Sequence, residues 1–224
     1  MTFSLVVRDA QTGAFGSLIS SSSPAVAARC VHLRDGVGAV HSQNVTDPRL
    51  GPRLLDLLAA GAGAADALSE LVAGEPTADW RQLLLVDAAG RTAVHSGAHA
   101  LGTVGEHAVE GAAAAGNLLA TPRVPQRLVE AYLQATGSLE RRLLAAYEAA
   151  MAEGGEAGPV HSAGLSVVTG AGWRVTDLRV DWSETPLQDL TDLLQVWEPQ
   201  REDYIVRALR PEDAPGYGVP GDQR

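Results

Sequence analysis

The sequence predicts an α+β domain in which antiparallel sheets are covered by helices. The expected elements run in the order strands, two helices, strands, two helices, strands, helix. Short turn-forming segments, such as residues 10–13 and 87–90, join neighbouring strands into hairpins. The regular β-α-β alternation of a parallel sheet is absent. These observations together favour layered antiparallel sheets.

Each element is predicted from a simple pattern. Apolar and β-branched runs predict strands at residues 3–8, 14–21, 37–43, 83–86, 91–95, 110–115, 164–169 and 173–180. Apolar residues spaced three and four apart predict helices at residues 49–73, interrupted at 61–63, and at 125–135, 138–152 and 186–197. Ser138 is a good helix N-cap.

The pattern fades after Pro199 into proline, glycine and charge, so we expect a domain at residues 1–198 and an extended tail at 199–224. A chain of 224 residues is long enough for one large domain.

Composition narrows the class of protein. A net charge of −10 without a basic stripe argues against nucleic-acid binding. No segment approaches the length of a membrane helix, and no secretory leader is visible at the N-terminus. The sequence therefore predicts a soluble, cytoplasmic protein with no nucleic-acid or membrane partner. Cys30 is the single cysteine, which excludes an internal disulfide.

Thr2 is the strongest candidate for chemistry. A strand begins with this residue, and a small second residue is the kind that permits removal of Met1. The chain would then start with a hydroxyl nucleophile and an α-amino group whose ordinary pKa of about 7.7–8 suits a base at neutral pH. The alternative is that Thr2 opens a strand because it is β-branched.

Other kinds of site find less support. His95 and His99 have an i, i+4 spacing that straddles a strand end and a glycine, so we expect no metal site. Residues 61–66 loosely resemble a dinucleotide fingerprint but join two helices. A Gly-x-Ser-x-Gly elbow and a phosphate-binding loop are absent, and Cys30 reads as a small core residue. No cofactor is predicted.

Polar clusters at residues 20–23 and at Gly116-Asn117 stand where strands are expected to end. They fit ordinary turn and cap chemistry, and they equally fit hydrogen bonding to a substrate or an oxyanion. The sequence leaves both interpretations open.

The order of these segments resembles the DUF1028 family of bacterial proteins, which is assigned to the N-terminal nucleophile (Ntn) hydrolase superfamily. The resemblance spans nearly the whole chain. It rests on residues 2–9, on Ser21 with 24–26 and 28–29, on 36–40 with Gln43, on 51–53 leading into 57–58, on 116–119, on 177–181 and on 217–222. Residues 155–164 depart from the family pattern, because they lack its arginine and glutamine.

The resemblance implies a four-layer αββα sandwich like that of a proteasome β-subunit. Carried onto this chain, it makes Thr2 the nucleophile. It places Arg29 as a basic residue that tunes the nucleophile, and Ser21 in the same cleft. Gly116 and Asn117, with Gln43, become candidates for the substrate or oxyanion pocket.

The implied activity is hydrolysis of a C–N bond in a small amide or ureide-like substrate by a homo-oligomeric enzyme. The alternative function is a non-catalytic protein that keeps the fold and binds a small metabolite or a partner.

Overall fold

Two antiparallel sheets form the centre of the structure. A computed structural model describes residues 1–222 of the chain. Within them, a six-stranded sheet has the order β10-β9-β2-β1-β8-β7, and a four-stranded sheet has the order β3-β4-β5-β6. The strands are β1 (Thr2–Arg8), β2 (Phe15–Ser21), β3 (Val31–Arg34), β4 (Gly38–Asn44), β5 (Arg81–Asp87), β6 (Thr92–Ser96), β7 (Gly105–Val109), β8 (Ala112–Asn117), β9 (Ser162–Val168) and β10 (Arg174–Val180).

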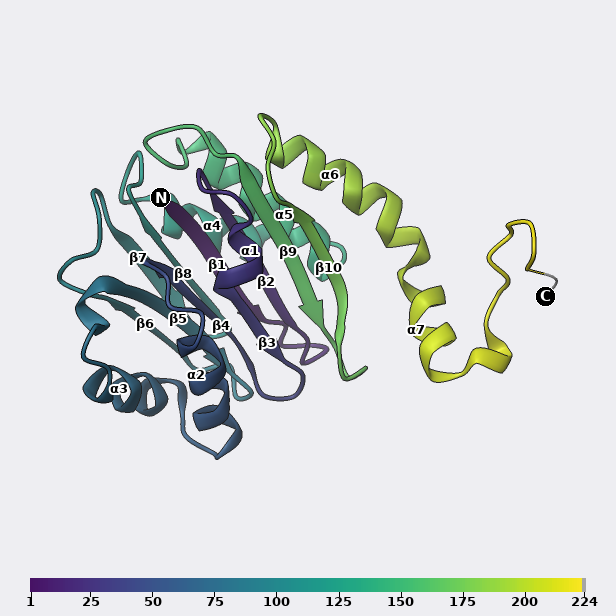
Figure 1. The fold of residues 1–224 in the computed structure, drawn as a ribbon, viewed down its shortest axis with the longest axis horizontal. Coiled ribbons are helices and arrows are strands. Elements are labelled where there is room, and N and C mark those ends of the chain that lie inside the picture. The colour runs from purple at the N-terminus through teal and green to yellow at the C-terminus, as the bar shows by residue number, and fades with distance from the viewer. Residues whose placement is uncertain (223–224) are drawn as a thin grey trace.

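Helices cover the outer face of each sheet (Figure 1). The helices are α1 (Val26–Cys30), α2 (Leu50–Ala59), α3 (Ala64–Gly74), α4 (Val124–Gln134), α5 (Leu139–Ala152), α6 (Pro186–Trp197) and α7 (Arg201–Leu209). Helices α2 and α3 pack on the smaller sheet, whereas α4, α5 and α6 pack on the larger one. The predicted four-layer αββα sandwich is therefore confirmed.

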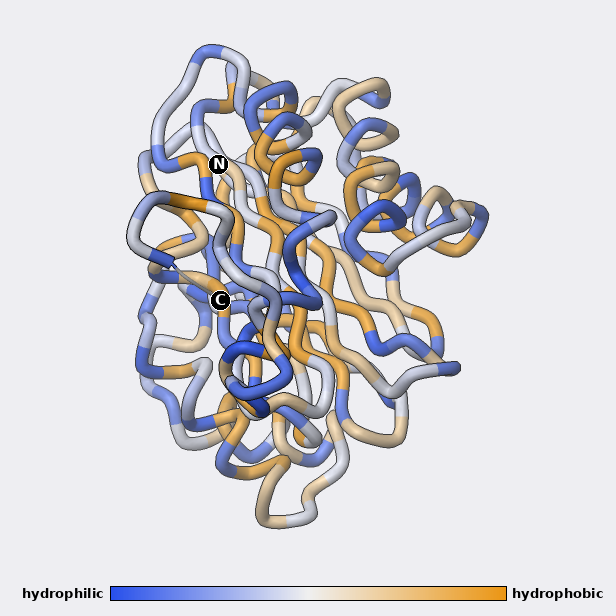
Figure 2. Tube along the Cα trace, turned by 90° about the vertical axis from the view of Figure 1, so that its right-hand side faces the viewer, coloured by the Kyte–Doolittle hydropathy of each residue, from blue (hydrophilic) through white to orange (hydrophobic). Residues whose placement is uncertain are grey.

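Apolar side chains fill the three spaces between these layers. One cluster joins the larger sheet to its helices, one joins the smaller sheet to α2 and α3, and a third lies between the sheets. Figure 2 shows the apolar segments following the strands, while hydrophilic segments gather at turns and outer helix faces. Strand β1 lies inside the larger sheet, and its side chains from Thr2 to Val7 are all buried.

A buried histidine links the two sheets directly. Ser17 Oγ on β2 lies 2.6 Å from His41 Nε2 on β4, and both residues are fully buried. Burial lowers the pKa of His41 to about 3, so its ring is neutral at physiological pH.

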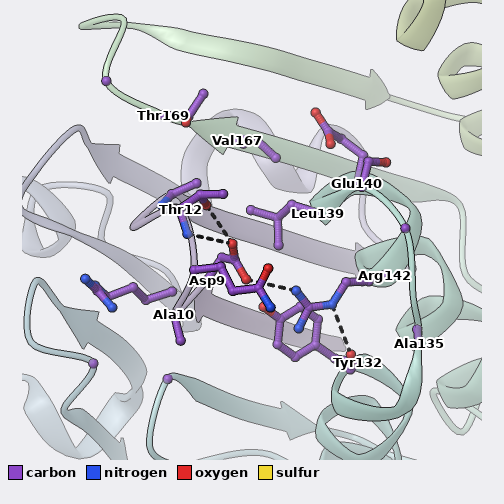
Figure 3. A pocket seen from close by; sticks show the side chains of 18 of the residues that line it. Asp9, Ala10, Thr12, Tyr132, Ala135, Leu139, Glu140, Arg142, Val167 and Thr169 are labelled. Atoms are coloured by element: carbon purple, nitrogen blue, oxygen red, sulfur yellow. Dashed lines mark hydrogen bonds and ion pairs between the residues drawn. The ribbon is translucent and has the colours of Figure 1, made fainter.

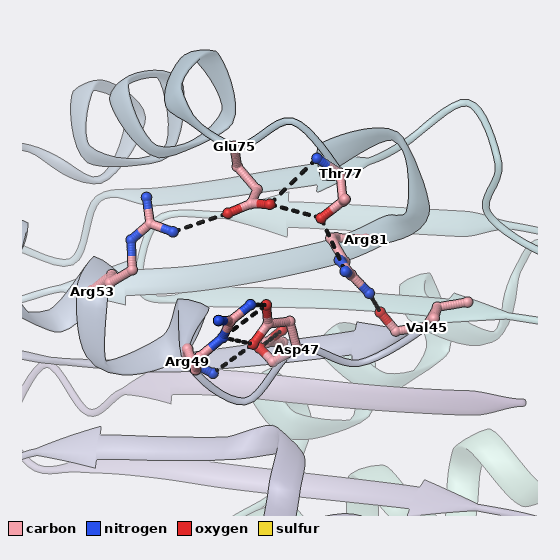
Figure 4. Close-up of polar contacts among 8 residues, drawn as sticks. Val45, Asp47, Arg49, Arg53, Glu75, Thr77 and Arg81 are labelled. Carbon is pink, nitrogen blue, oxygen red and sulfur yellow. Dashed lines mark hydrogen bonds and ion pairs between the residues drawn. The ribbon is translucent and has the colours of Figure 1, made fainter.

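Charged side chains fix the loops at the edge of the sandwich where β1 begins (Figure 4). Asp47 follows β4 and accepts hydrogen bonds from Arg49, including one of 2.6 Å. Nearby, Glu75 accepts from Arg53 at 2.9 Å, and Arg81 donates to the carbonyl of Val45. The contact of Arg81 with Val45 holds the start of β5 to the end of β4.

Four elements differ from the sequence prediction. The short helix α1 and strand β3 follow the predicted polar loop, and β7 precedes the predicted strand at 110–115. The predicted extended tail contains helix α7, which packs on the body because Arg201 pairs with the buried Glu140 at 2.6 Å and Trp197 stacks on Tyr204. The charged residues and prolines of 199–213 give no clear helical pattern in the sequence. The helix is stabilised by tertiary contacts of its few apolar residues, which the sequence pattern does not reveal.

No helix between residues 1 and 222 is long and apolar enough to span a bilayer. Over the same residues, no group of three or more His, Cys, Asp or Glu side chains is arranged to hold a metal ion.

Gly97 gives a test of this packing. A Cβ at this buried position would lie 2.3 Å from the carbonyl oxygen of Asp79, a main-chain atom that has little freedom to move. We expect Gly97→Ala to lower the free energy of unfolding by about 1–3 kcal/mol, measured by urea denaturation. Gly74→Ala is the matched control, because a Cβ there meets nothing within 4 Å and alanine has a higher helix propensity than glycine at this last residue of α3. Equal midpoints for the two variants would contradict the described packing.

Candidate active site

Three neighbouring strands of the larger sheet carry a polar side chain at the same edge. Thr2 opens β1, Ser21 closes β2 and Asn117 closes β8. Thr2 pairs with Asn117 across the strands, and Thr2 Oγ1 lies 3.4 Å from Ser21 Oγ. All three are buried, with at most 5% of their surface exposed. Because Ser4, two residues along β1, bonds to Gln43 of the other sheet, this row of side chains faces the space between the sheets.

The hydroxyls of this row hold the first peptide group of the chain. Thr2 Oγ1 and Ser21 Oγ both donate to the main-chain carbonyl oxygen of Met1. Two donors on one oxygen form the arrangement that stabilises developing negative charge on a carbonyl. The Thr2 hydroxyl therefore lies beside a carbonyl group that is already hydrogen-bonded.

Arg29 reaches this row through intermediate residues. Its guanidinium donates to Ser23 Oγ at 2.7 Å and to the carbonyl of Pro24. Ser23 Oγ in turn lies 2.8 Å from Ser21 Oγ. The structure thus connects Arg29 to Thr2 in a chain through Ser23 and Ser21, and the Arg29 guanidinium forms no hydrogen bond with Thr2 itself.

A chain of buried amides lies behind the row. Asn117 Nδ2 donates to Gln82 Oε1 at 3.0 Å, and Gln43 Nε2 donates to the same oxygen at 2.8 Å. Gln43 accepts from Ser4 Oγ at 2.7 Å, and Gln82 donates to the carbonyl of Gly116 at 3.0 Å. Gln43 in the facing sheet and Gly116, which precedes Asn117 on β8, therefore support Asn117 through Gln82.

Asn117 keeps one unsatisfied group. Its Oδ1 is buried and has no hydrogen-bond partner, although the side chain is fully enclosed. The next residue, Leu118, has a φ of 51°, in the left-handed region that branched residues rarely adopt. An unpaired buried acceptor and local backbone strain both cost free energy, and both are concentrated at functional sites.

Glu156 is a carboxylate at this edge that the sequence analysis did not single out. It is 4% exposed, and its two oxygens lie 3.1 and 3.2 Å from the backbone N–H of Ser22, which donates to them. It also bridges Leu119, two residues after Asn117. Burial raises the pKa of Glu156 to about 7, while the positive α-amino group of Met1 and the hydrogen bonds from Ser22 act to lower it.

Sequence reasoning assigned no role to Glu156 or Gln82, and it included Ser23 only as one member of the polar cluster at residues 20–23. Gln82 carried a signal, because it is a polar residue at the start of a strand whose other inner positions are apolar. Glu156 lies in the segment that departs from the family pattern. Ser23 belongs to a run of serines in which nothing distinguishes one hydroxyl from the next.

A large cavity lies at the opposite end of β1. It has a volume of about 1090 Å³ and lies among the turn after β1, the α4–α5 connection and α7. Asp9 and Arg142 form an ion pair there at 3.0 Å, and the Arg142 guanidinium lies over the ring of Tyr132 (Figure 3). None of the six residues predicted for the site lines this cavity. Its size is therefore no guide to the chemistry expected at Thr2.

Comparison with known proteins gives a family model that matches most of the chain. The family model described as a family of unknown function (DUF1028) matches residues 2–190. A crystal structure of a DUF1028 protein from Silicibacter pomeroyi shares 27% identity, with a TM-score of 0.81 over 87% of this chain and 88% of that one. Among curated proteins, none matches this sequence.

Two proteasome-related structures are partially similar. Eukaryotic HslV from Trypanosoma brucei has 14% identity and a TM-score of 0.47, covering 75% of this chain and 99% of that one. The ancestral β-subunit Anbu from Yersinia bercovieri has 9% identity and a TM-score of 0.42, covering 88% and 97%.

The pKa of Glu156 predicts a pH dependence of stability. Its folded-state pKa, near 7, exceeds its ordinary value of 4.5, so the folded protein binds more protons between these values. The contribution of Glu156 to stability is therefore present below pH 4.5 and lost as pH rises through 7. We expect the wild type to lose about 2–3 kcal/mol from pH 4.5 to 8 through this group, and Glu156→Gln to lack this loss. Urea denaturation across that range measures both, and parallel pH profiles for the two proteins would contradict the assignment.

Proposed function

Because the chain belongs to the DUF1028 family, we propose that it is an N-terminal nucleophile hydrolase that cleaves a C–N bond of a small amide or ureide-like substrate. Thr2 is the nucleophile once Met1 has been removed. The observation that carries this proposal is the position of the Thr2 hydroxyl, buried beside Ser21 and Asn117 and bonded to a carbonyl oxygen.

The proposed reaction uses two groups of one residue. The Thr2 hydroxyl attacks the substrate carbonyl, and its α-amino group accepts the hydroxyl proton and passes it to the departing amine. The resulting ester on Thr2 is hydrolysed by water, which regenerates the hydroxyl. An amine with an ordinary pKa of about 7.7–8 is partly unprotonated at neutral pH and can act as this base.

The other predicted residues receive supporting roles in the proposal. Ser21 donates a hydrogen bond to the carbonyl oxygen under attack, as it now does to that of Met1. Arg29 holds Ser23 and places a positive charge behind Ser21. Asn117 offers its unpaired oxygen to the substrate, and Gln43 and Gly116 keep that side chain in place through Gln82.

Assembly and domain division also belong to the proposal. We take residues 1–198 as the hydrolase domain and the remainder as a C-terminal extension that contacts a neighbouring subunit of a homo-oligomer. The family match, which ends at residue 190, agrees with such a division. Exposed Tyr217 and Val219 give the extension apolar surface for that contact.

Thr2 provides the decisive test. Mass spectrometry of the purified protein is expected to show a chain beginning at Thr2. On a panel of small amides, Thr2→Ala should lower kcat/KM by at least about 10³-fold, while Thr2→Ser should retain measurable turnover because it keeps both the hydroxyl and the amine. An intact Met1, or a Thr2→Ala variant as active as the wild type, would disprove the proposal. Binding of amides without turnover would instead favour a non-catalytic binding protein.

Ser21 is tested against its neighbour. Ser21→Ala removes a donor from the carbonyl oxygen, and we expect kcat to fall about tenfold to hundredfold. Ser20→Ala is the matched control, because Ser20 is equally buried but bonds to Tyr147 on the helix-covered face. Its loss should affect unfolding more than turnover. A similar loss of kcat in both variants would remove Ser21 from the proposed role.

A further inference from the structure

Met1 lies in the structure as an aminoacyl group held beside the Thr2 hydroxyl. Its carbonyl oxygen accepts hydrogen bonds from Thr2 and Ser21. Its side chain lies against Gly158, where a Cβ would come within 3.4 Å of Met1 Cε. Met1 is only half-buried, so this place is open to solvent on one side.

The segment 155–158 forms a wall of this place. Gly155 packs near Phe3, Glu156 is fixed by Ser22 and Leu119, and Gly158 borders the Met1 side chain. Since Ser22 directly follows Ser21, the carboxylate of Glu156 is anchored one residue away from the hydroxyl that holds the carbonyl. Segment 155–158 is therefore attached by a hydrogen bond to the strand end that carries the Ser21 hydroxyl.

Glu156 is a buried carboxylate without an arginine partner among residues 1–222. Its hydrogen bonds come from a neutral backbone N–H. The carboxylate is held by Ser22 next to Ser21, whose hydroxyl bonds to the Met1 carbonyl, and the positive charge of the Met1 α-amino group acts to lower the pKa of this carboxyl. A buried carboxylate is costly unless a positive group compensates it, so this position favours an ammonium group nearby.

We propose that the place of Met1 is the acyl subsite of the enzyme, and that it selects substrates bearing a free α-amino group, which faces Glu156. The substrate class is thus the amide of an α-amino acid with an unbranched apolar side chain like that of methionine. This inference rests on the proposed function of Thr2, because Met1 must leave before a substrate can take its place.

The reaction balances without any further reagent. The Thr2 hydroxyl forms an ester bond with the α-aminoacyl carbon as the C–N bond breaks, and the hydroxyl proton passes through the Thr2 amine to the leaving amine. Water then cleaves the ester, which releases a free amino acid and restores Thr2. Glu156 takes no proton in this scheme and acts by holding the substrate ammonium group.

The experiment compares two probes on protein whose mass shows Thr2 as its first residue. L-methionine p-nitroanilide carries the free amine, and N-acetyl-L-methionine p-nitroanilide has the same side chain without the charge. We expect the wild type to favour the free amine at least tenfold in kcat/KM. Glu156→Gln keeps an acceptor for Ser22 but loses the charge, and should reduce that preference about tenfold to hundredfold.

Controls separate recognition from folding. Glu140→Gln changes a carboxylate that is equally buried at the far end of the sandwich, and should leave the preference unaltered. Gly158→Val narrows the place of the Met1 side chain. It should raise the KM for L-methionine p-nitroanilide more than the KM for L-alanine p-nitroanilide. A wild type indifferent to acetylation would overturn the inference. A Glu156→Gln variant that slows both probes equally would also overturn it, because the carboxylate would then serve the Thr2 amine.

A binding measurement separates this inference from the proposed function. L-methioninamide and N-acetyl-L-methioninamide are titrated by calorimetry into the same protein and into Glu156→Gln. If no amide is turned over but L-methioninamide binds preferentially and Glu156→Gln abolishes the preference, the subsite stands and the hydrolase proposal fails. If neither compound binds and neither probe is hydrolysed, the subsite is rejected.

Discussion

The pairing of β1 with strands on both sides is the constraint on which the candidate site depends. Within the larger sheet, β1 bonds to β2 and β8 along nearly its full length, beginning with Thr2 opposite Asn117. Backbone hydrogen bonds of this kind fix the position of a terminal residue that would otherwise be mobile. A nucleophile at the start of a chain needs such support, because catalysis requires its hydroxyl and amine to keep one geometry. The side chains of Thr2 and Asn117 are oriented directly by this pairing.

The space between the sheets changes character along its length. Toward one end it is filled by apolar residues such as Val6, Ala113 and Leu84, and toward the other by Ser4, Gln43 and their amide partners. Buried amides are tolerable only when their hydrogen bonds are made, and the chain from Ser4 to Asn117 satisfies nearly all of them. The exception is Asn117 Oδ1, beside Thr2. The unpaired acceptor of this polar end therefore lies beside Thr2, where a ligand could donate a hydrogen bond to it.

The sequence predicted the layers and most strands and helices because their apolar periods are strong and their turns are marked by glycine. It also named Thr2, Ser21 and Asn117 as candidate site residues, and the structure brings these three together because three strand ends meet at one edge. It did not predict Gln82 or Glu156. Gln82 reaches Asn117 because the two sheets stack face to face. Glu156 reaches this edge because the loop after α5 folds back beside Leu119, which follows β8. Contacts between separate sheets and loops depend on tertiary packing, for which a single sequence carries no periodic signal.

Removal of Met1 has a definite physical consequence for this edge. With Met1 in place, its carbonyl oxygen satisfies two hydroxyls and its charge acts on Glu156. Without Met1, the Thr2 and Ser21 hydroxyls lose their shared acceptor, and the carboxylate loses that positive charge unless the new amine at Thr2 supplies it. A molecule that restores both interactions must present a carbonyl oxygen and a cation with the spacing of an aminoacyl group. In the proposed reaction, the complementarity of the site to its own first residue becomes complementarity to a substrate, because the same donors and the same carboxylate remain fixed by β2, β8 and the loop that carries Glu156.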